Sequence, residues 1–212
     1  PGLPADKIVV KLHAATVNRT DIGFLRAHPF FIRLMTGLFR PKRRVLGNEF
    51  AGEVEEAGSG VSEWAVGERV FGYDDVAQGC HAEYKLVPES GVLSTIPDGL
   101  DYTEIVPANE GAHYALSYVR ASNPQPGQSV LINGTTGAIG SAALQLFKYY
   151  RAEVTAVCDT ERVELVQSLG ADHIIDYNEE DFTKSGETFD VVFDAAGKSS
   201  FFACRHLITP GG

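Results

Sequence analysis

Three glycines spaced three residues apart, Gly134, Gly137 and Gly140, have the clearest chemical meaning in this chain. They follow a largely apolar run, residues 130–133, and an apolar pattern of helical spacing starts at Ile139. Backbone approaches a phosphate closely only where side chains are absent, and a helix N-terminus offers free N–H groups and a partial positive charge. A strand, a glycine turn and a helix in this order therefore predict a site for the pyrophosphate of a dinucleotide.

The predicted cofactor site extends beyond this turn to later predicted elements. Its members are Gly134, Thr135, Thr136, Gly137, Ala138, Ile139, Gly140, Asp159, Arg162, Tyr177 and Ala196. Asp159 bears on the choice of cofactor, because an acid at the end of the second strand bonds the adenosine ribose and rejects a 2′-phosphate. Alternatively, Asp159 or Thr160 caps a helix that starts near Glu161, and Arg162 meets a phosphate instead.

Composition and charge exclude several classes of protein. The 212 residues carry a net charge of −10, which disfavours sequence-independent binding of nucleic acid. Apolar runs are shorter than the roughly 20 residues that cross a bilayer, and the start has no signal-peptide pattern. The three cysteines lie far apart without a CxxC, so we expect neither a disulfide framework nor a structural zinc cluster, and a cytoplasmic location.

Two rhythms divide the chain into an expected domain 1–98 and a second domain 99–212. Up to about Pro97 it consists of short predicted strands and glycine turns, which favour a small barrel or sandwich. Predicted strands and helices alternate after the glycine turn, which favours a doubly wound parallel sheet of the α/β class. The stretch 98–127 is expected to be largely helical and to join the two halves.

Three stretches carry a resemblance to a known family: residues 47–61 with 66–72, residues 133–140, and residues 154–177. Together they resemble the medium-chain dehydrogenase/reductase superfamily, in its zinc-independent quinone-oxidoreductase-like branch. The resemblance covers essentially the whole chain. It implies a GroES-like barrel followed by a Rossmann domain, in agreement with the two rhythms.

The resemblance also implies a site without zinc. The zinc-dependent alcohol dehydrogenases of the superfamily bind catalytic zinc through a Cys, a His and a Cys or acidic residue. The matching positions here are Asn18, Asn48 and Ala108, and an amide is a poor zinc ligand while a methyl group is none. Without a metal to polarise the acceptor, an activated one is favoured. We therefore expect hydride transfer from NAD(P)H to a quinone or an α,β-unsaturated carbonyl.

Two other functions stay open at this point: a zinc-free alcohol or aldehyde reductase, and a dinucleotide-binding protein with little catalysis. The cofactor is also open between NADH and NADPH. The resemblance places the usual acidic position at Cys158, and many NADPH-using relatives have Ser where Asp159 stands, so the prediction leans slightly to NADPH.

Asn18, Asp21 and Asn48 are the candidate catalytic residues. Either amide would donate a hydrogen bond to the acceptor oxygen, or both hold loops together. Gly23 stands where several family members carry a Tyr, so no proton donor is carried over. Tyr73 and His113 are substitutes, although each is more readily explained as a structural residue, and water is a further proton source.

The ends and one apolar segment complete the predictions. Without an initiator Met and ending in a turn signal, the chain is expected to be a C-terminally truncated fragment, with a homodimer expected for the full-length protein. The segment 29–44 combines apolar residues with Arg and Lys. It suits a lid over an apolar substrate or a loop against the barrel, and less well a membrane contact.

Overall fold

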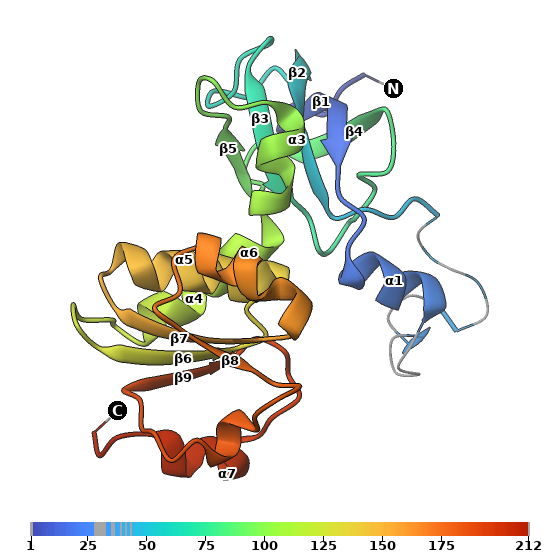
Figure 1. The fold of residues 1–212 in the computed structure, drawn as a ribbon. Coiled ribbons are helices and arrows are strands. Elements are labelled where there is room, and N and C mark those ends of the chain that lie inside the picture. Colours follow the sequence, from blue (N-terminus) through green and yellow to red (C-terminus); the bar gives the residue numbers. More distant parts are fainter. Residues whose placement is uncertain are drawn as a thin grey trace. The chain divides into compact units, whose positions relative to one another are not determined.

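The computed structural model describes residues 2–27, 33, 34, 37, 38, 40, 42 and 44–211 (Figure 1). The chain divides into two compact units, Pro1–Asn109 and Glu110–Gly212. This division falls later along the chain than the predicted domain boundary between residues 98 and 99. The physical reason is that Ile105 and Val106 pack with Ala51 and Ile96 of the first unit. Most of the segment 29–44, with its predicted lid or membrane contact, lies outside the described residues.

The first unit is built around a five-stranded antiparallel sheet with the strand order β4-β1-β2-β3-β5. Its elements are β1 (Lys7–Ala15), α1 (Arg19–Arg26), β2 (Glu49–Ala57), β3 (Arg69–Tyr73), β4 (Tyr84–Pro88), β5 (Leu93–Thr95), α3 (Tyr102–Ile105) and η1 (Val106–Ala108). Alternate residues of β1, such as Ile8 and Val10, are fully buried in a core with Phe50 and Val70. This two-residue period is that of strands with one face in a core.

The second unit contains a four-stranded parallel sheet with the order β8-β7-β6-β9. Its elements are α4 (Glu110–Ala121), β6 (Ser129–Asn133), α5 (Ala138–Tyr149), β7 (Glu153–Cys158), η2 (Thr160–Arg162), α6 (Val163–Ser168), β8 (His173–Asp176), η3 (Phe182–Lys184), β9 (Val191–Asp194), α7 (Phe201–Cys204) and η4 (Arg205–Leu207). The chain runs outward from β6 to β8 and then returns to β9 beside β6. The strand order thus reverses at β6, where parallel sheets form ligand sites at their carboxyl ends.

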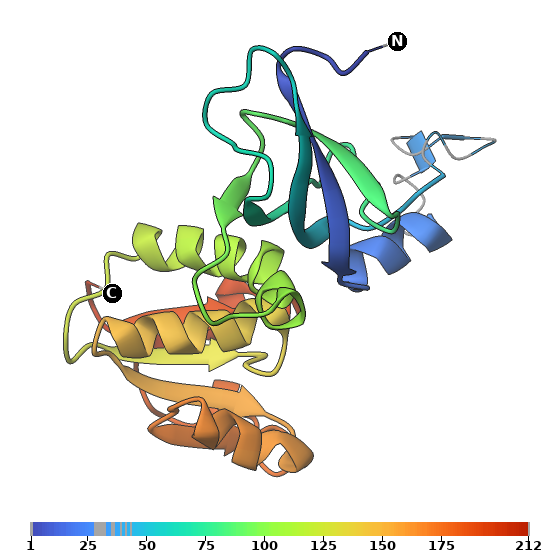
Figure 2. The ribbon, with the colours of Figure 1, turned by 90° about the horizontal axis from the view of Figure 1, so that it is seen from above.

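Helices cover both faces of this parallel sheet, as a doubly wound fold requires (Figure 1). Val130 and Ile132 pack with α4, α5 and α6, whereas Leu131 between them packs with Cys204 and Leu207 on the other face. Helices α4 and α5 lie side by side (Figure 2). Gly111 permits this approach, because a Cβ there would lie 2.8 Å from the Ala138 Cβ.

Two helices of the second unit are combined with 3-10 turns. The helix expected to start near Glu161 begins as the 3-10 turn η2 before α6, and the last helix is α7 followed by η4. Gly170 ends α6 with a φ of +101°, as expected for a glycine just past a helix. Within the part of the chain that the structure describes, no helix is long and apolar enough to cross a membrane.

Candidate functional site

The glycine turn connects β6 to α5 at the point where the strand order reverses. Gly134 has a φ of +84°, and a Cβ there would lie 3.0 Å from the Ala196 backbone nitrogen. A Cβ on Gly140 would lie 2.1 Å from the Gly134 carbonyl oxygen, so the first turn of α5 touches the backbone of the loop. These two glycines are required by the fold itself. At Gly137 the nearest atom would be 3.6 Å away, which leaves room for a side chain.

The predicted residues of this turn divide by exposure into two groups. Thr135 is fully buried, and its hydroxyl donates to the Val157 carbonyl oxygen at 2.9 Å. Ile139 packs against the core of the sheet. These side chains hold the loop in place, whereas Gly137 and Ala138 are exposed. Gly137 occupies the N-cap position of α5 without a side-chain cap, so the helix N-terminus presents backbone N–H groups there.

Asp159 follows β7 and carries an unsatisfied acceptor. Its Oδ1 is buried and has no hydrogen-bond partner among the described residues. Asp159 lies at the N-cap of η2, yet its side chain makes no capping hydrogen bond, so the alternative of a helix cap is not what the geometry shows. A carboxylate oxygen that is buried without a donor is costly, and a ribose hydroxyl is a donor that suits it. The residues of this edge therefore fit a dinucleotide.

Other predicted cofactor residues also lie at the carboxyl ends of the parallel strands. Tyr177 follows β8, is 54% exposed, and donates its backbone N–H to the Cys158 carbonyl oxygen. Arg162 is exposed at the end of η2. Ala196 follows β9 and lies against Gly134. Because the strands are parallel, their carboxyl ends bring together residues that are up to 62 positions apart in the sequence, from Gly134 to Ala196.

Asp194 organises the loop that carries Ala196, and the sequence analysis missed it. Its Oδ1 accepts from Asn133 Nδ2 at 3.0 Å and from the backbone N–H groups of Ala196 and Gly197, both at 3.1 Å. Its Oδ2 accepts from the Ser199 N–H at 2.9 Å. An Asp just before Ala-Ala-Gly at a strand end was the available signal for such a turn.

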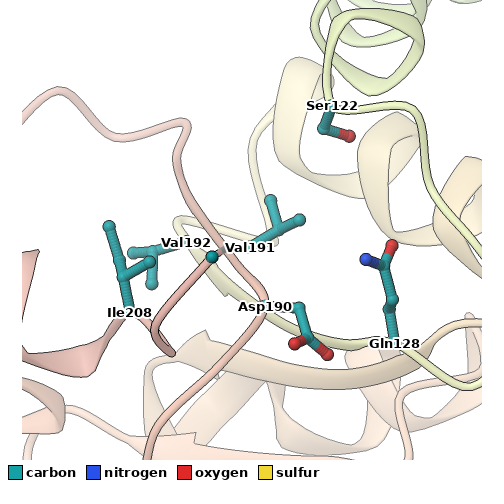
Figure 3. A pocket seen from close by; sticks show the side chains of 7 residues that line it. Ser122, Gln128, Asp190, Val191, Val192 and Ile208 are labelled. Atoms are coloured by element: carbon teal, nitrogen blue, oxygen red, sulfur yellow. The ribbon is translucent and has the colours of Figure 1, made fainter.

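A pocket of about 270 Å³ lies at the other end of the strands of the same sheet (Figure 3). Its lining residues include Gln128 and Asp190, which precede β6 and β9 and so mark the amino ends of these strands. The glycine turn follows the carboxyl end of β6. This pocket is therefore not the predicted cofactor site.

A network of amides and carboxylates, called here the amide network, lies where β1 ends, β2 begins and β3 ends in the first unit. The strand register pairs Ala15 with Phe50 and Glu49 with Tyr73, which places the end of β1, the start of β2 and the end of β3 together. Asn18 Nδ2 donates to Asn48 Oδ1 at 2.8 Å and to Glu49 Oε2 at 3.1 Å. The Thr16 hydroxyl donates to the same Glu49 oxygen. Asn48 and Glu49 are buried.

Asn18 is also the N-cap of α1 in a capping box. Its Oδ1 accepts from the N–H groups of Thr20 and Asp21, while Asp21 Oδ2 accepts from the Asn18 N–H at 3.0 Å. Both N–H bonds of the Asn18 amide and its oxygen are thus used within the protein. The structure thereby shows the loop-holding role that the sequence left as one of two alternatives.

Asp21 extends the network toward the loop before β2. Its Oδ1 accepts from the Gly47 N–H at 2.9 Å, and its Oδ2 lies 3.9 Å from His81 Nε2. His81 Nε2 donates to the Thr16 carbonyl oxygen at 2.8 Å. Gly47 has a φ of +90°, and a Cβ there would lie 2.5 Å from the His81 ring. The three predicted catalytic residues Asn18, Asp21 and Asn48 are therefore brought together.

Asp75 is a further member that sequence reasoning missed. It accepts from Asn48 Nδ2 at 2.9 Å and belongs to a turn that follows β3. Of the other sequence candidates, Tyr73 ends β3 opposite Glu49 in the strand register, Ala108 lies in η1, and His113 is exposed on α4. Among the residues that the structure describes, no group of three His, Cys, Asp or Glu side chains is arranged to hold a metal ion.

Two thiols, those of Cys80 and Cys158, are held in the protonated form. Burial raises the pKa of the Cys80 thiol to about 12, and the carboxylates of Asp74, Asp21 and Glu49 act in the same direction against Lys85. Burial, followed by the charges of Asp159 and Asp176, raises the pKa of the Cys158 thiol as well. A protonated thiol is a poor nucleophile and metal ligand, so neither cysteine suits nucleophilic chemistry.

Two protein-family models match this chain. Residues 4–98 match the alcohol dehydrogenase GroES-like domain, and residues 138–212 match the zinc-binding dehydrogenase domain. The chain belongs to the medium-chain dehydrogenase/reductase superfamily, in its quinone-oxidoreductase-like branch.

Three similar proteins illustrate this membership. A trans-enoyl reductase of Aspergillus terreus is 31% identical over 99% of this chain and 61% of its own length. A chloroplastic NADPH-dependent alkenal/one oxidoreductase of Arabidopsis thaliana is 31% identical over 93% of this chain and 52% of its own length. The solved quinone oxidoreductase of Coxiella burnetii has a TM-score of 0.88 at 25% identity, covering 100% of this chain and 67% of that one. The chain spans about half to three fifths of the length of the curated relatives that it matches.

Proposed function

We propose that this chain belongs to an NAD(P)H-dependent, zinc-independent oxidoreductase that transfers hydride to a quinone or an α,β-unsaturated carbonyl. The observation that carries the proposal is the amide network in the first unit. By the family resemblance, Asn18 and Asn48 match the positions of zinc ligands in the zinc-dependent members, and here they bond to each other at 2.8 Å. The names of the similar proteins, enoyl and alkenal/one reductases and quinone oxidoreductases, support the same activity.

The second unit would hold the cofactor. A bound reduced nicotinamide supplies the hydride. The N–H groups at the start of α5, exposed beside Gly137 and Ala138, would bind the pyrophosphate, because the helix N-terminus favours negative charge. Asp159 Oδ1 would accept from a ribose hydroxyl. Gly134, Thr135 and Gly140 act indirectly, by keeping the turn in the conformation that exposes these donors.

The first unit would shape the site of the acceptor. Conjugation in a quinone or enone spreads the negative charge that arrives with hydride, so such an acceptor needs orientation and few hydrogen bonds rather than a Lewis acid. Asn18, Asp21 and Asn48 would form a preorganised wall of this pocket. An acceptor oxygen that bonds to the Asn18 amide must replace Asn48 or Glu49 as its partner. We propose water as the source of the proton.

Zinc is not part of the proposed mechanism. Amide nitrogens do not bind zinc well, and the amide oxygens of Asn18 and Asn48 already accept hydrogen bonds from protein groups. The test is metal analysis of the complete protein together with acceptor reduction in the presence of a strong chelator. One equivalent of bound zinc, or activity lost to the chelator and restored by zinc, contradicts this part of the proposal.

NADPH is the proposed preferred cofactor, with measurable use of NADH. The preference follows the relative whose name specifies NADPH. The partnerless Oδ1 of Asp159 limits the preference, since a carboxylate repels a 2′-phosphate. Turnover with both cofactors at equal concentration decides the matter, and equal or better turnover with NADH contradicts the preference.

Stopped-flow oxidation of bound NADPH tests the activity itself. The complete protein is mixed with a panel of quinones, enones and unconjugated aldehydes. We expect oxidation by the first two classes and at most slow oxidation by aldehydes. Tight cofactor binding without oxidation by any acceptor identifies a dinucleotide-binding protein instead, and preference for aldehydes identifies an aldehyde reductase.

The proposed partner is a small apolar carbonyl or quinone. A homodimer of the complete protein and a cytoplasmic location stay predictions. Analytical ultracentrifugation with intact mass measurement checks the first, and fractionation of cells checks the second. The chloroplastic relative shows that members of the family also work in organelles.

A further inference from the structure

A buried lysine contacts the turn that lies next to the amide network of the first unit. Lys85 is in β4 and is only 6% exposed. Its Nζ lies 3.1 Å from Asp74 Oδ2 and donates to the Gln78 carbonyl oxygen. Lysine is rarely buried without a partner, and a buried ion pair brings little net stability compared with apolar side chains of similar volume. What the Lys85 pair does fix is the conformation of the turn that it contacts.

This turn, residues 74–78, is tied down at both ends. Asp74 Oδ1 accepts from the N–H groups of Val76 and Ala77, and the Asp74 N–H donates to the Asn48 carbonyl oxygen at 2.7 Å. Gln78 has a φ of +54°, which is unfavourable for a residue with a side chain. The buried side-chain amide of Gln78 has no hydrogen-bond partner among the described residues. Gln78 is thus held through its main chain: its N–H donates to the Asp74 carbonyl oxygen at 3.1 Å, and Lys85 binds its carbonyl group.

The turn in turn positions the amides. Asp75, next to Asp74, accepts from Asn48 Nδ2 at 2.9 Å, and Asn48 Oδ1 accepts from Asn18 at 2.8 Å. A continuous series of contacts therefore runs from Lys85 through the turn to Asn48 and Asn18. We propose that Lys85 is a positioning residue that fixes the orientation of both amides. The effect of Lys85 on catalysis rests on the proposed function of the amide network.

The kinetic test compares two lysines with matched partners. Lys148 of the second unit binds the Asp172 carboxylate and the Ala152 carbonyl oxygen, as Lys85 binds Asp74 and Gln78. In the complete protein, we expect K85M to lower kcat/KM for the acceptor about tenfold or more while NADPH affinity stays within about twofold. K148M leaves kcat/KM for the acceptor unchanged, and K85R, which keeps the charge, retains more activity than K85M.

A readout independent of activity separates this inference from the proposed function. The side-chain amide ¹⁵N signals of Asn18 and Asn48 report their hydrogen bonds directly. We expect K85M to shift both signals and K148M to shift neither. If a folded K85M protein leaves both signals in place, the inference is wrong. If the unmodified protein reduces no acceptor, the proposed function fails, and the amide signals still decide the role of Lys85.

A second variant covers the case in which K85M does not fold. Asp75→Leu leaves Lys85 and Asp74 intact and removes the hydrogen bond from the Asn48 side chain to the turn. We expect the same shifts and the same tenfold effect from it, and in the double variant the two losses should not add, because both act on one series of contacts. If K85M folds, additive losses contradict the inference. If K85M does not fold, D75L with unshifted amide signals contradicts it.

Discussion

The two units solve the problem of holding a reactant with different parts of the polypeptide. The glycine turn of the second unit uses backbone: a left-handed Gly134, a close approach at Gly140 and an uncapped helix N-terminus. The amide network of the first unit uses side chains, with Asn18 and Asn48 held by carboxylates. A backbone site tolerates few changes at its glycines and many around them. A side-chain network is sensitive at every member, since each partner that is lost leaves a buried polar group unsatisfied.

The largest effect is expected from a methyl group in the backbone site. Gly140→Ala places a Cβ against the Gly134 carbonyl, so we expect a loss of about 3 kcal/mol in the free energy of unfolding. Urea denaturation measures it. Gly137→Ala is the matched control, because its Cβ has room within the protein. It should cost about 0.5–1 kcal/mol in stability, because Ala is a weaker N-cap than Gly, yet weaken NADPH binding about tenfold or more by crowding the phosphates. Equal stability losses contradict this distinction.

A comparable change in the side-chain network should act on the acceptor instead. Asn48→Leu removes the donor to Asp75 and the acceptor for Asn18, with an expected stability loss of about 2 kcal/mol. kcat/KM for the acceptor should fall about tenfold while the Kd of NADPH is unchanged. Isothermal titration with steady-state kinetics checks both. A weaker affinity for NADPH without a change in acceptor kinetics would reverse the assignment of the two units.

Asp159 offers a smaller and more selective test of the second unit. Asp159→Ser removes the carboxylate whose Oδ1 is buried without a partner in the described structure. We expect the ratio of kcat/KM for NADPH over NADH to rise about tenfold, with stability retained. Unchanged selectivity would show that Asp159 does not face the ribose.

The smallest effect compares the two lysine–aspartate pairs under acid conditions. Burial alone would raise the pKa of the Asp74 carboxyl, but hydrogen bonds from the Ala77 N–H and Lys85 outweigh it and lower this pKa below 3.8. The folded state thus binds fewer protons than the unfolded state, so the contribution of Asp74 is complete above about pH 4 and is lost as the pH falls through the folded pKa.

We expect the free energy of unfolding to fall less steeply below pH 4 in D74N than in the unmodified protein, by up to one proton in slope. The same net lowering holds for the pKa of Asp172, where burial opposes the bonds from Lys148 and Val154. D172N is the control, with a smaller change because the Asp172 side chain is 35% exposed against 21% for Asp74. Urea denaturation at several pH values measures both slopes. A larger change in D172N would contradict the ranking.

Local sequence predicted the class of both units: short strands and glycine turns in the first, and alternating strands and helices in the second. The positions of β6, α5 and β7 follow from apolar periodicity and glycine spacing, which depend on neighbours in the chain. The boundary between the two compact units did not follow from local sequence, because residues 99–109 have no composition that assigns them to either unit. The cap role of Asn18 was one of two alternatives until its partners were known.

The sequence by itself determined the α/β order of the second unit and the dinucleotide turn at Gly134, Gly137 and Gly140, since a backbone site is encoded by spacing along a few residues. Tertiary structure alone decided the hydrogen bonds of the amide network. Asn18, Asn48, Asp75 and Lys85 come from separate segments, and only the register of β1 with β2 and β4, and of β2 with β3, brings them to one place. Hydrogen-bond partners chosen by strand register across tens of residues leave no local pattern in the sequence.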